Sequence, residues 1–394
     1  MQKDPIIIAS FARTPIGNLL GELKDCTATQ LGSYVIKAVI DRAQLQPSAI
    51  HEVIMGCVLP AGLGQAPARQ AALGAGVSNK TPCTTINKVC GSGMKAVMFA
   101  HDILSTQSTD VMVAGGMESM TNAPFILLKV RQGYRYGQQT LYDHMMLDGL
   151  EDAYDKGRAM GYFAEQCAKK YGFSRKQQDD YAISSFERAK HAEREKLFNA
   201  EIVPITLQTK QGDKIITMDE HPFSVNPEKI HTLPAAFIKD GTVTAGNSSS
   251  IADGAAAVTL MRLSTAEKQH IKPIARIIGH ASSAKASDEF TTAPIDATQL
   301  LLQKINWQIN DVDLFEFNEA FAVVILAIMH DLKIPRDKIN IHGGACALGH
   351  PIGATGARIL VTLISSLQQN KLKRGIASLC IGGGEATAIA IEMI

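Results

Sequence analysis

The chain has 394 residues, of which 46% are hydrophobic and 20% are charged, and its formal net charge is +1. This composition is that of a globular protein with enough apolar material for a large core, and the length favours two or three structural units. The near-zero charge gives no reason to expect nucleic acid or an anionic membrane surface as a partner. The longest apolar run, residues 320–329, is far shorter than the ~20 residues of a membrane span.

The N-terminal residues and the cysteines indicate the cellular compartment in which we expect the protein. Residues 6–8 (Ile-Ile-Ile) follow Lys3 and Asp4, and this run is too short for the core of a signal peptide. We interpret it as a first strand. The seven cysteines are odd in number and include no Cys-x-x-Cys pair. Their spacing supports neither a zinc site nor a disulfide framework, so we expect reduced thiols in a cytoplasmic protein.

Short β-rich runs alternate with helix-like segments along the chain, which favours an α/β architecture. Strands are predicted over residues 52–56, 110–115 and 375–380. The two ends of the chain also resemble each other. Three pairs of segments match at a nearly constant offset, namely 48–56 with 310–318, 92–96 with 355–359, and 110–118 with 377–385. Their common order predicts a duplicated half-domain.

The segment between these ends has a different character, with charge clusters, Tyr-Gly turns and one surface helix. Ser174 to Gln177 has the form of a capping box, and residues 179–198 carry apolar side chains at helical spacing. We interpret the basic side chains of this helix as a solvated face, namely Arg188, Lys190, Arg194 and Lys196. Loops on a rigid scaffold commonly set specificity, so this insertion is the expected substrate-binding unit. Three units are predicted: an N-terminal half (1–120 and 247–270), an inserted loop domain (121–246) and a C-terminal half (271–394).

Cys90 lies inside a glycine-rich signature, Val-Cys-Gly-Ser-Gly-Met. A strand-like stretch ends near Val89, and a helical run is predicted over residues 94–104. A thiol at a helix N-terminus meets unpaired N–H groups and the positive end of the helix dipole, which lower its pKa. The glycines let a bulky thioester approach the backbone. These features indicate a nucleophile, and the local sequence leaves a small buried hydrophobe open as the alternative.

Two further residues could assist such a nucleophile. His350 lies in a Gly-His-Pro turn before the helix-like residues 357–367, where a neutral imidazole could take the proton of Cys90. Cys380 ends an apolar strand and enters Ile-Gly-Gly-Gly, whose closely spaced N–H groups suit an oxyanion. Read singly, the histidine could be structural and the second cysteine could belong to the core.

These signatures, with the Asn-Glu-Ala-Phe-Ala run that begins at Asn318, match the thiolase family in order and approximate spacing. The chain resembles a thiolase over nearly its full length. The resemblance implies a duplicated α/β core in α-β-α-β-α layers and a ping-pong acyl transfer. Cys90 would carry the acyl group as a thioester, His350 would activate Cys90, and Cys380 would move the α-proton. One oxyanion site would combine His350 with a water held by Asn318, and the other the N–H groups of Cys90 and Gly382.

The resemblance also implies the ligands. Acetyl-CoA, acetoacetyl-CoA or another 3-ketoacyl-CoA would be the substrate, and coenzyme A would be substrate and product. No metal or redox cofactor is implied, and the expected assembly is a homotetramer built as a dimer of dimers. The residues placed against the coenzyme A arm are Ser249, Ala245, Met160 and Phe321.

Two features depart from the family pattern. Ala159 stands where thiolases specialised for acetoacetyl-CoA often carry a histidine, so the acyl chain-length preference stays open. A Leu-Pro-Ala run from Leu233 replaces a basic residue common in the family. The nucleotide end of coenzyme A would then be held elsewhere, by Lys210, Lys214 or Lys229.

The leading hypothesis is reversible condensation of two acetyl-CoA molecules to acetoacetyl-CoA and coenzyme A. A broad-range 3-ketoacyl-CoA thiolase of fatty-acid degradation is the nearest alternative. A 3-ketoacyl synthase would carry a second histidine or an asparagine where Cys380 stands. An inactive acyl-CoA-binding protein need not keep Cys90, His350 and Cys380 together, and a cysteine protease would not place its thiol between a strand and a helix.

Overall fold

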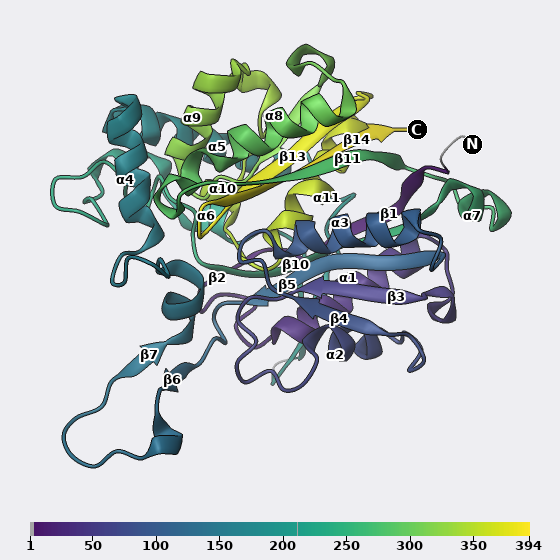
Figure 1. Ribbon diagram of the computed structural model, residues 1–394, viewed down its shortest axis with the longest axis horizontal. Coiled ribbons are helices and arrows are strands. Elements are labelled where there is room, and N and C mark those ends of the chain that lie inside the picture. The colour runs from purple at the N-terminus through teal and green to yellow at the C-terminus, as the bar shows by residue number, and fades with distance from the viewer. Residues whose placement is uncertain (1–3, 211) are drawn as a thin grey trace.

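Two half-sheets with the same strand order form the centre of the molecule (Figure 1). The computed structural model describes residues 4–210 and 212–394. The N-terminal order is β3 (Glu52–Gly56), β5 (Val111–Ser119), β10 (Ala252–Arg262) and β1 (Ile6–Arg13). The C-terminal order is β12 (Leu314–Phe317), β13 (Arg374–Ile381), β14 (Glu385–Met393) and β11 (Ala275–Ala284). In each half the first two strands are parallel and the next two join antiparallel, which confirms the duplication.

The two half-sheets are joined through β1, which pairs with β10 on one side and briefly with β11 on the other. Two further strands extend the N-terminal half. β4 (Cys83–Ile86) pairs with β3, and β2 (Gly17–Asn18) pairs with β10. The strand predicted at residues 6–8 continues to Arg13, and the strand predicted at 52–56 has those bounds.

Helices complete five layers around the half-sheets, because each apolar face must be covered. α1 (Ala28–Arg42) and α2 (Pro67–Gly74) cover the outer N-terminal face, and α8 (Ala293–Ile305) and α9 (Ala322–Leu332) cover the outer C-terminal face. Between the half-sheets lie α3 (Ser92–Ser105) and α11 (Thr355–Gln369), whose apolar side chains share one core with both. This arrangement confirms the predicted α-β-α-β-α layering.

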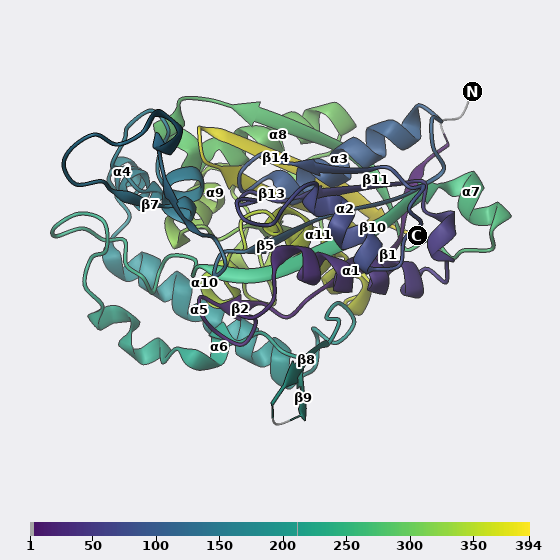
Figure 2. The same cartoon turned by 90° about the horizontal axis from the view of Figure 1, so that it is seen from below.

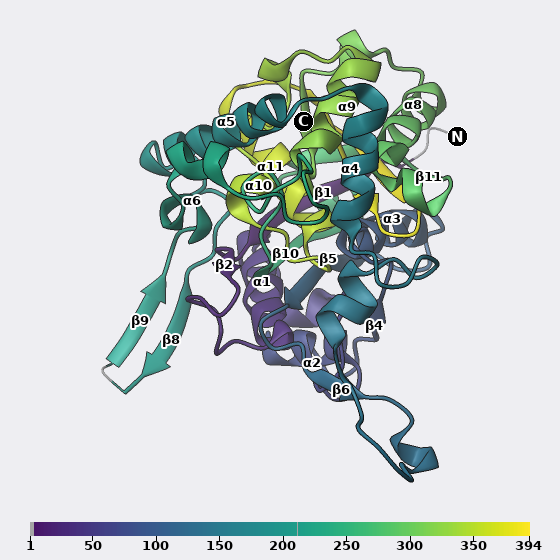
Figure 3. The ribbon, with the colours of Figure 1, turned by 90° about the vertical axis from the view of Figure 1, so that its left-hand side faces the viewer.

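The chain between β5 and β10 forms two projecting hairpins and the helices beside them (Figures 2 and 3). The hairpins are β6 (Phe125–Leu127) with β7 (Leu141–Asp143), and β8 (Ile205–Thr209) with β9 (Gly212–Ile216). The helical elements are η2 (Val130–Gln132), the π-helical turn η3 (Met146–Leu150), α4 (Met160–Tyr171), α5 (Arg175–Arg194), α6 (His221–Ser224) and η4 (Pro227–Thr232). Elsewhere lie η1 (Pro47–Ala49), α7 (Leu263–Lys268), η5 (Ser287–Thr292), η6 (Ile309–Asp311), η7 (Arg336–Lys338) and α10 (Ala345–Leu348). The three unit boundaries remain predictions.

Helix α5 starts with the predicted capping box. Ser174 Oγ accepts from Gln177 N at 3.2 Å, and the Gln177 side chain accepts from Ser174 N at 2.8 Å. The helix begins at Arg175, four residues earlier than predicted, because this cap fixes its first turn. The interpretation of a solvated basic face is wrong for Arg188. Its guanidinium is partly buried and donates to the Ile339 carbonyl at 2.7 Å, since that loop packs against the helix.

The two helices of the central layer are slightly longer than predicted. The prediction of residues 94–104 becomes Ser92–Ser105, and that of 357–367 becomes Thr355–Gln369. Both therefore begin closer to Cys90 and His350 than the sequence indicated. Among the described residues, no helix has the length and apolar character needed to cross a membrane.

Candidate active site

Cys90 sits on a tight turn between β4 and α3. The preceding residue, Val89, has φ +46°, a left-handed conformation that is costly for a β-branched side chain. The turn is held on both sides, because Val89 N donates to Asn87 Oδ1 at 2.9 Å and Ser92 Oγ donates to the Val89 carbonyl at 2.6 Å. Strained backbone that the surroundings enforce is typical of a residue presented for chemistry.

Close glycine contacts bring the start of α11 onto the start of α3. A Cβ built on Gly93 would lie 2.9 Å from Ala357 N, and one on Gly356 would lie 2.4 Å from Met94 N. Only glycine fits at these positions without moving backbone. The N-termini of the two central helices therefore converge, and they bring the Cys90 and His350 turns to the same place.

The expectation that the pKa of Cys90 is lowered is wrong for the protein without substrate. Burial raises the pKa of the thiol to about 11. Hydrogen bonds from the backbone N–H groups of Gly382 and of Cys90 itself pull the pKa down, but burial outweighs them. The same two N–H groups are those predicted for an oxyanion site, and both favour the thiolate form of Cys90.

The hydrogen bonds of His350 define its tautomer. Thr355 Oγ1 donates its only proton to the Pro351 carbonyl at 2.9 Å, so it must accept from His350 Nδ1, 2.6 Å away. Burial lowers the pKa of His350 to about 3, which keeps the ring neutral. A neutral ring with its proton on Nδ1 has a lone pair on Nε2, which is 3.4 Å from the amide donor Asn318 Nδ2 and can accept a proton. His350 is therefore arranged as a base.

Asn318 lies beside this lone pair. It follows β12, its backbone N donates to the Ser378 carbonyl at 3.1 Å, and its Nδ2 is 3.4 Å from His350 Nε2. Asn318 Oδ1 is buried and has no hydrogen-bond partner among the described residues. An amide oxygen in this state is a natural acceptor for a water or a ligand group. Asn318 and His350 are therefore in direct contact, and the oxyanion site predicted from His350 and a water held by Asn318 stays a prediction.

Cys380 is buried at the end of β13, and burial raises its pKa well above the ordinary value, with the nearby Cys90 adding to the effect. The chain then turns sharply into β14 through Gly383 and Gly384, at φ +90° and +88°. Gly382 comes before this turn, and its nearest side-chain atom is Met160 Sδ, 3.5 Å from a built Cβ. The glycines thus place a backbone N–H beside two thiols.

These groups line one narrow cavity of about 60 Å³. The sequence-predicted residues on its wall are Cys90, Met160, Ser249, Phe321, His350, Cys380 and Gly382. The residues that sequence reasoning missed are Gly149, Leu150, Phe290 and Ala320. These are apolar or small and carry no chemical signal of their own. The wall combines both half-domains and the inserted segment.

The remaining predicted ligand residues stay predictions. Ala245 is exposed and stands outside this cavity wall. Of the lysines suggested for the nucleotide end of coenzyme A, Lys214 pairs with Glu22 at the β8–β9 hairpin.

Two buried carboxylates, missed in the sequence, support the site from behind. Glu118 accepts from the backbone N of Val58 and of Gly353, each at 2.9 Å, and burial raises its pKa to about 7. Glu319, next to Asn318, accepts from Tyr181 Oη at 2.7 Å. It also accepts from Ser185 Oγ at 2.7 Å and from Asn340 Nδ2 at 2.9 Å. Each carboxylate ties loops of the site to the scaffold.

The comparisons with known proteins agree with this geometry. The model of the thiolase N-terminal domain matches residues 6–264, and that of the thiolase C-terminal domain matches residues 271–393. A probable acetyl-CoA acetyltransferase of Dictyostelium discoideum is 46% identical over 393 residues, covering 99% of this chain and 94% of the relative.

Solved structures match over the full chain. The acetyl-CoA acetyltransferase of Bacillus anthracis superposes with a TM-score of 0.96 at 37% identity, covering 100% of this chain and 99% of that one. The Acat5 thiolase from Ascaris suum, in complex with coenzyme A, gives 0.93 at 40% identity, covering 99% and 100%. The chain therefore belongs to the thiolase family.

Proposed function

We propose that this protein is an acetyl-CoA C-acetyltransferase that converts two acetyl-CoA molecules reversibly into acetoacetyl-CoA and coenzyme A. The observation that carries the proposal is the presence of Cys90, His350 and Cys380 on the wall of one small cavity. Two thiols and one neutral imidazole suit a reaction with two tasks, acyl transfer and proton transfer at carbon. The names of similar proteins support the same reaction.

In the first half-reaction, the Cys90 sulfur attacks the carbonyl carbon of acetyl-CoA. His350 Nε2 takes and keeps the thiol proton, and the Cys380 thiol protonates the coenzyme A sulfur as its bond to the acetyl carbon breaks, which leaves Cys380 as a thiolate. The Nδ1–H bond to Thr355 supports this role, because it keeps Nε2 unprotonated beforehand. After the transfer Nε2 carries a proton and becomes a hydrogen-bond donor. One ring thus serves as base and then as oxyanion donor.

In the second half-reaction, Cys380 removes an α-proton from a second acetyl-CoA, and the resulting carbanion attacks the acetyl carbon on Cys90. The C–S bond to Cys90 breaks, and acetoacetyl-CoA forms. The released Cys90 thiolate takes the proton back from His350 Nε2, and Cys380 keeps the α-proton as its thiol. Thiolysis is the reverse sequence. Burial of Cys380 favours its neutral form, so the thiolate exists only when a substrate arrives to accept or supply the proton.

Each half-reaction develops charge on a thioester oxygen, and preorganised donors at such positions commonly supply several kcal/mol of the rate enhancement. The N–H groups of Cys90 and Gly382 are the donors proposed for the acyl group on Cys90. The donors proposed for the second acetyl-CoA are His350 and a water bound to Asn318, whose Oδ1 lacks a partner among the described residues.

Exchange of the acetyl α-protons of acetyl-CoA with D₂O tests the division of labour. We expect Cys90→Ala to lose acetyl transfer but to retain exchange, and Cys380→Ser to show the opposite pattern. Wild-type condensation by Cys380→Ser would contradict its assigned role. Wild-type protein without exchange or turnover would favour an inactive acyl-CoA-binding protein instead.

The proposed function and its nearest alternative, a broad-range 3-ketoacyl-CoA thiolase, differ in the acyl chain length of the preferred substrate. The cavity beside Cys90 is small, at about 60 Å³, and this small size supports a short acyl group as the substrate. Ala159, next to the cavity residue Met160, favours the alternative because a small side chain leaves room.

Thiolysis rates measure this preference directly. We expect kcat/KM to be highest for acetoacetyl-CoA and to fall along a series of straight-chain 3-ketoacyl-CoA substrates. Equal or rising values with length would assign the broad-range activity. An Ala159→His variant tests the effect of the alanine at this position. It restores the histidine that acetoacetyl-CoA thiolases often carry, and it should sharpen a short-chain preference.

We also propose that the protein acts in the cytoplasm as a homotetramer, with no cofactor besides the coenzyme A of its substrates. Exposed apolar side chains on the β6–β7 arm support an assembly through this arm (Figure 1), namely Phe125, Val130, Tyr136 and Leu141. Light scattering on the native protein tests the tetramer. Replacing Tyr136 and Leu141 by serine should reduce the measured mass, and an unchanged mass would exclude the arm.

A further inference from the structure

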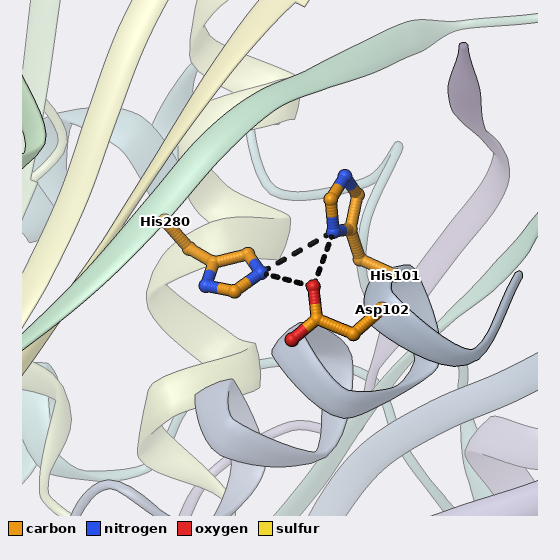
Figure 4. A group of neighbouring side chains, drawn as sticks. All are labelled: His101, Asp102 and His280. Atoms are coloured by element: carbon orange, nitrogen blue, oxygen red, sulfur yellow. Dashed lines mark hydrogen bonds and ion pairs between the residues drawn. The ribbon is translucent and has the colours of Figure 1, made fainter. Parts of the chain in front are cut away.

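A second cluster of titratable side chains lies away from the cavity, where α3 meets β11 (Figure 4). His101 and Asp102 are neighbours near the end of α3, and His280 projects from β11. His280 Nε2 lies 2.9 Å from Asp102 Oδ1 and 3.2 Å from His101 Nδ1, and His101 Nδ1 lies 3.0 Å from Asp102 Oδ1. Three Lewis-basic atoms therefore converge on one point.

Hydrogen bonds alone satisfy this triangle poorly. Asp102 Oδ1 can accept from both rings, but two N–H groups would then face each other across the 3.2 Å contact between the imidazoles. If one ring nitrogen is unprotonated, Asp102 loses a donor. A cation bound to all three atoms removes the conflict, because each atom then offers a lone pair to the same centre.

The distances fit a metal ion closely. A centre placed about 2.1 Å from all three atoms, the usual zinc–nitrogen and zinc–oxygen length, would stand about 1 Å out of their plane. The angles between its bonds would be roughly 90–100°, within the range of a distorted tetrahedral or a facial octahedral site. A site of two imidazoles and one carboxylate binds Zn²⁺, Co²⁺ and Ni²⁺ better than it binds Ca²⁺ or Mg²⁺, which favour oxygen ligands.

We propose that His101, Asp102 and His280 bind one divalent transition-metal ion of the Zn²⁺ class. A surface groove of about 590 Å³ lies beside the site, and His280 lines it together with Lys95 and Lys304. These lysines disfavour a second cation and suit an anion or a hydroxide as the further ligand. The site is separate from the acyl-transfer chemistry proposed for Cys90.

The consequence of binding is structural. α3 belongs to the N-terminal half and starts two residues after Cys90, whereas β11 belongs to the C-terminal half. A metal held by both would clamp the halves together and would stabilise the folded state by mass action. Nothing in the sequence spacing indicated the site, because His280 lies far along the chain from His101.

Cobalt titration of the untagged full-length protein tests the proposal, since Co²⁺ reports its ligands by absorption. We expect one Co²⁺ per chain, a spectrum without thiolate charge-transfer bands, and a rise in Tm. Loss of an outer-shell partner alone typically weakens metal binding by about 10–100-fold, so His101→Ala and Asp102→Ala should each weaken it at least about tenfold. Both positions are at least partly exposed, so these variants should fold.

His330→Ala and Asp331→Ala are matched controls. His330 and Asp331 form the same adjacent pair on α9, 2.7 Å apart, but they have no third ligand in the described part of the chain. These controls should leave cobalt binding unchanged. Equal binding by wild type and His101→Ala, a thiolate spectrum, or equal loss in the controls would each overturn the proposal.

Discussion

Thr355→Val tests the arrangement that makes His350 a base. Valine has nearly the same shape as threonine but lacks Oγ1, the atom that accepts from His350 Nδ1 at 2.6 Å. The buried Nδ1–H then has no acceptor, or the ring changes to the other tautomer and Nε2 loses the lone pair that would accept the proton. Either outcome weakens proton transfer from Cys90.

The size of the effect follows from the cost of the lost acceptor. An unsatisfied buried donor costs about 1–3 kcal/mol. At about 1.4 kcal/mol for each factor of ten in rate, acetylation of Cys90 should slow by about 5- to 150-fold. Exchange of the acetyl α-protons depends on Cys380 and should change much less. Thr355→Ser keeps the hydroxyl and should recover most of the rate.

The assay is pre-steady-state acetylation of the protein by acetyl-CoA, with Tm measured on the same samples. Thr362→Val is the control, because it removes another buried hydroxyl from α11, one that contacts Glu201. If the effect of Thr355→Val were only structural, both variants would have a lower Tm, and their folded forms would be acetylated at the same rate. Acetylation of folded Thr355→Val at the wild-type rate would refute the reasoning.

Three further predictions concern the thiol and the scaffold. Because the pKa of Cys90 is about 11, the rate of its alkylation by iodoacetamide should rise ~tenfold per pH unit from pH 7 to 10. Peptide mapping measures this rate, and a plateau below pH 8 would contradict the prediction. Gly384→Ala should lower Tm strongly, because its φ is +88° and a Cβ would lie 2.4 Å from the Lys285 carbonyl, whereas Gly382→Ala should keep Tm. Arg13→Met should cost about 3–5 kcal/mol in urea unfolding, since it leaves two buried carboxylates unpaired; a loss below about 1 kcal/mol would show that they find other partners.

The sequence and its resemblance to the thiolase family predicted the layered fold and most of the residues that the structure brings to one cavity wall. Glycines around Cys90, His350 and Cys380 mark tight turns and close approach, and both are local properties that spacing records. The duplication was also visible, because the two halves kept matching segments in one order.

The electrostatics could not be predicted in the same way. A helix N-terminus lowers a thiol pKa, but the amount of burial at Cys90 depends on segments distant in the chain, and burial won. Arg188 was expected in solvent for the same reason, since the loop that it contacts is remote in sequence. Leu150 and Phe290 line the cavity through apolar contact alone, which no motif records.

The most direct test of the account is the site of acetylation after incubation with acetyl-CoA, mapped by mass spectrometry of the digested protein. The account predicts one acetyl group on Cys90 in the wild type and in Cys380→Ser, and none in Cys90→Ala. Acetylation of another residue, or an adduct that persists in Cys90→Ala, would contradict the assignment of Cys90 as the nucleophile.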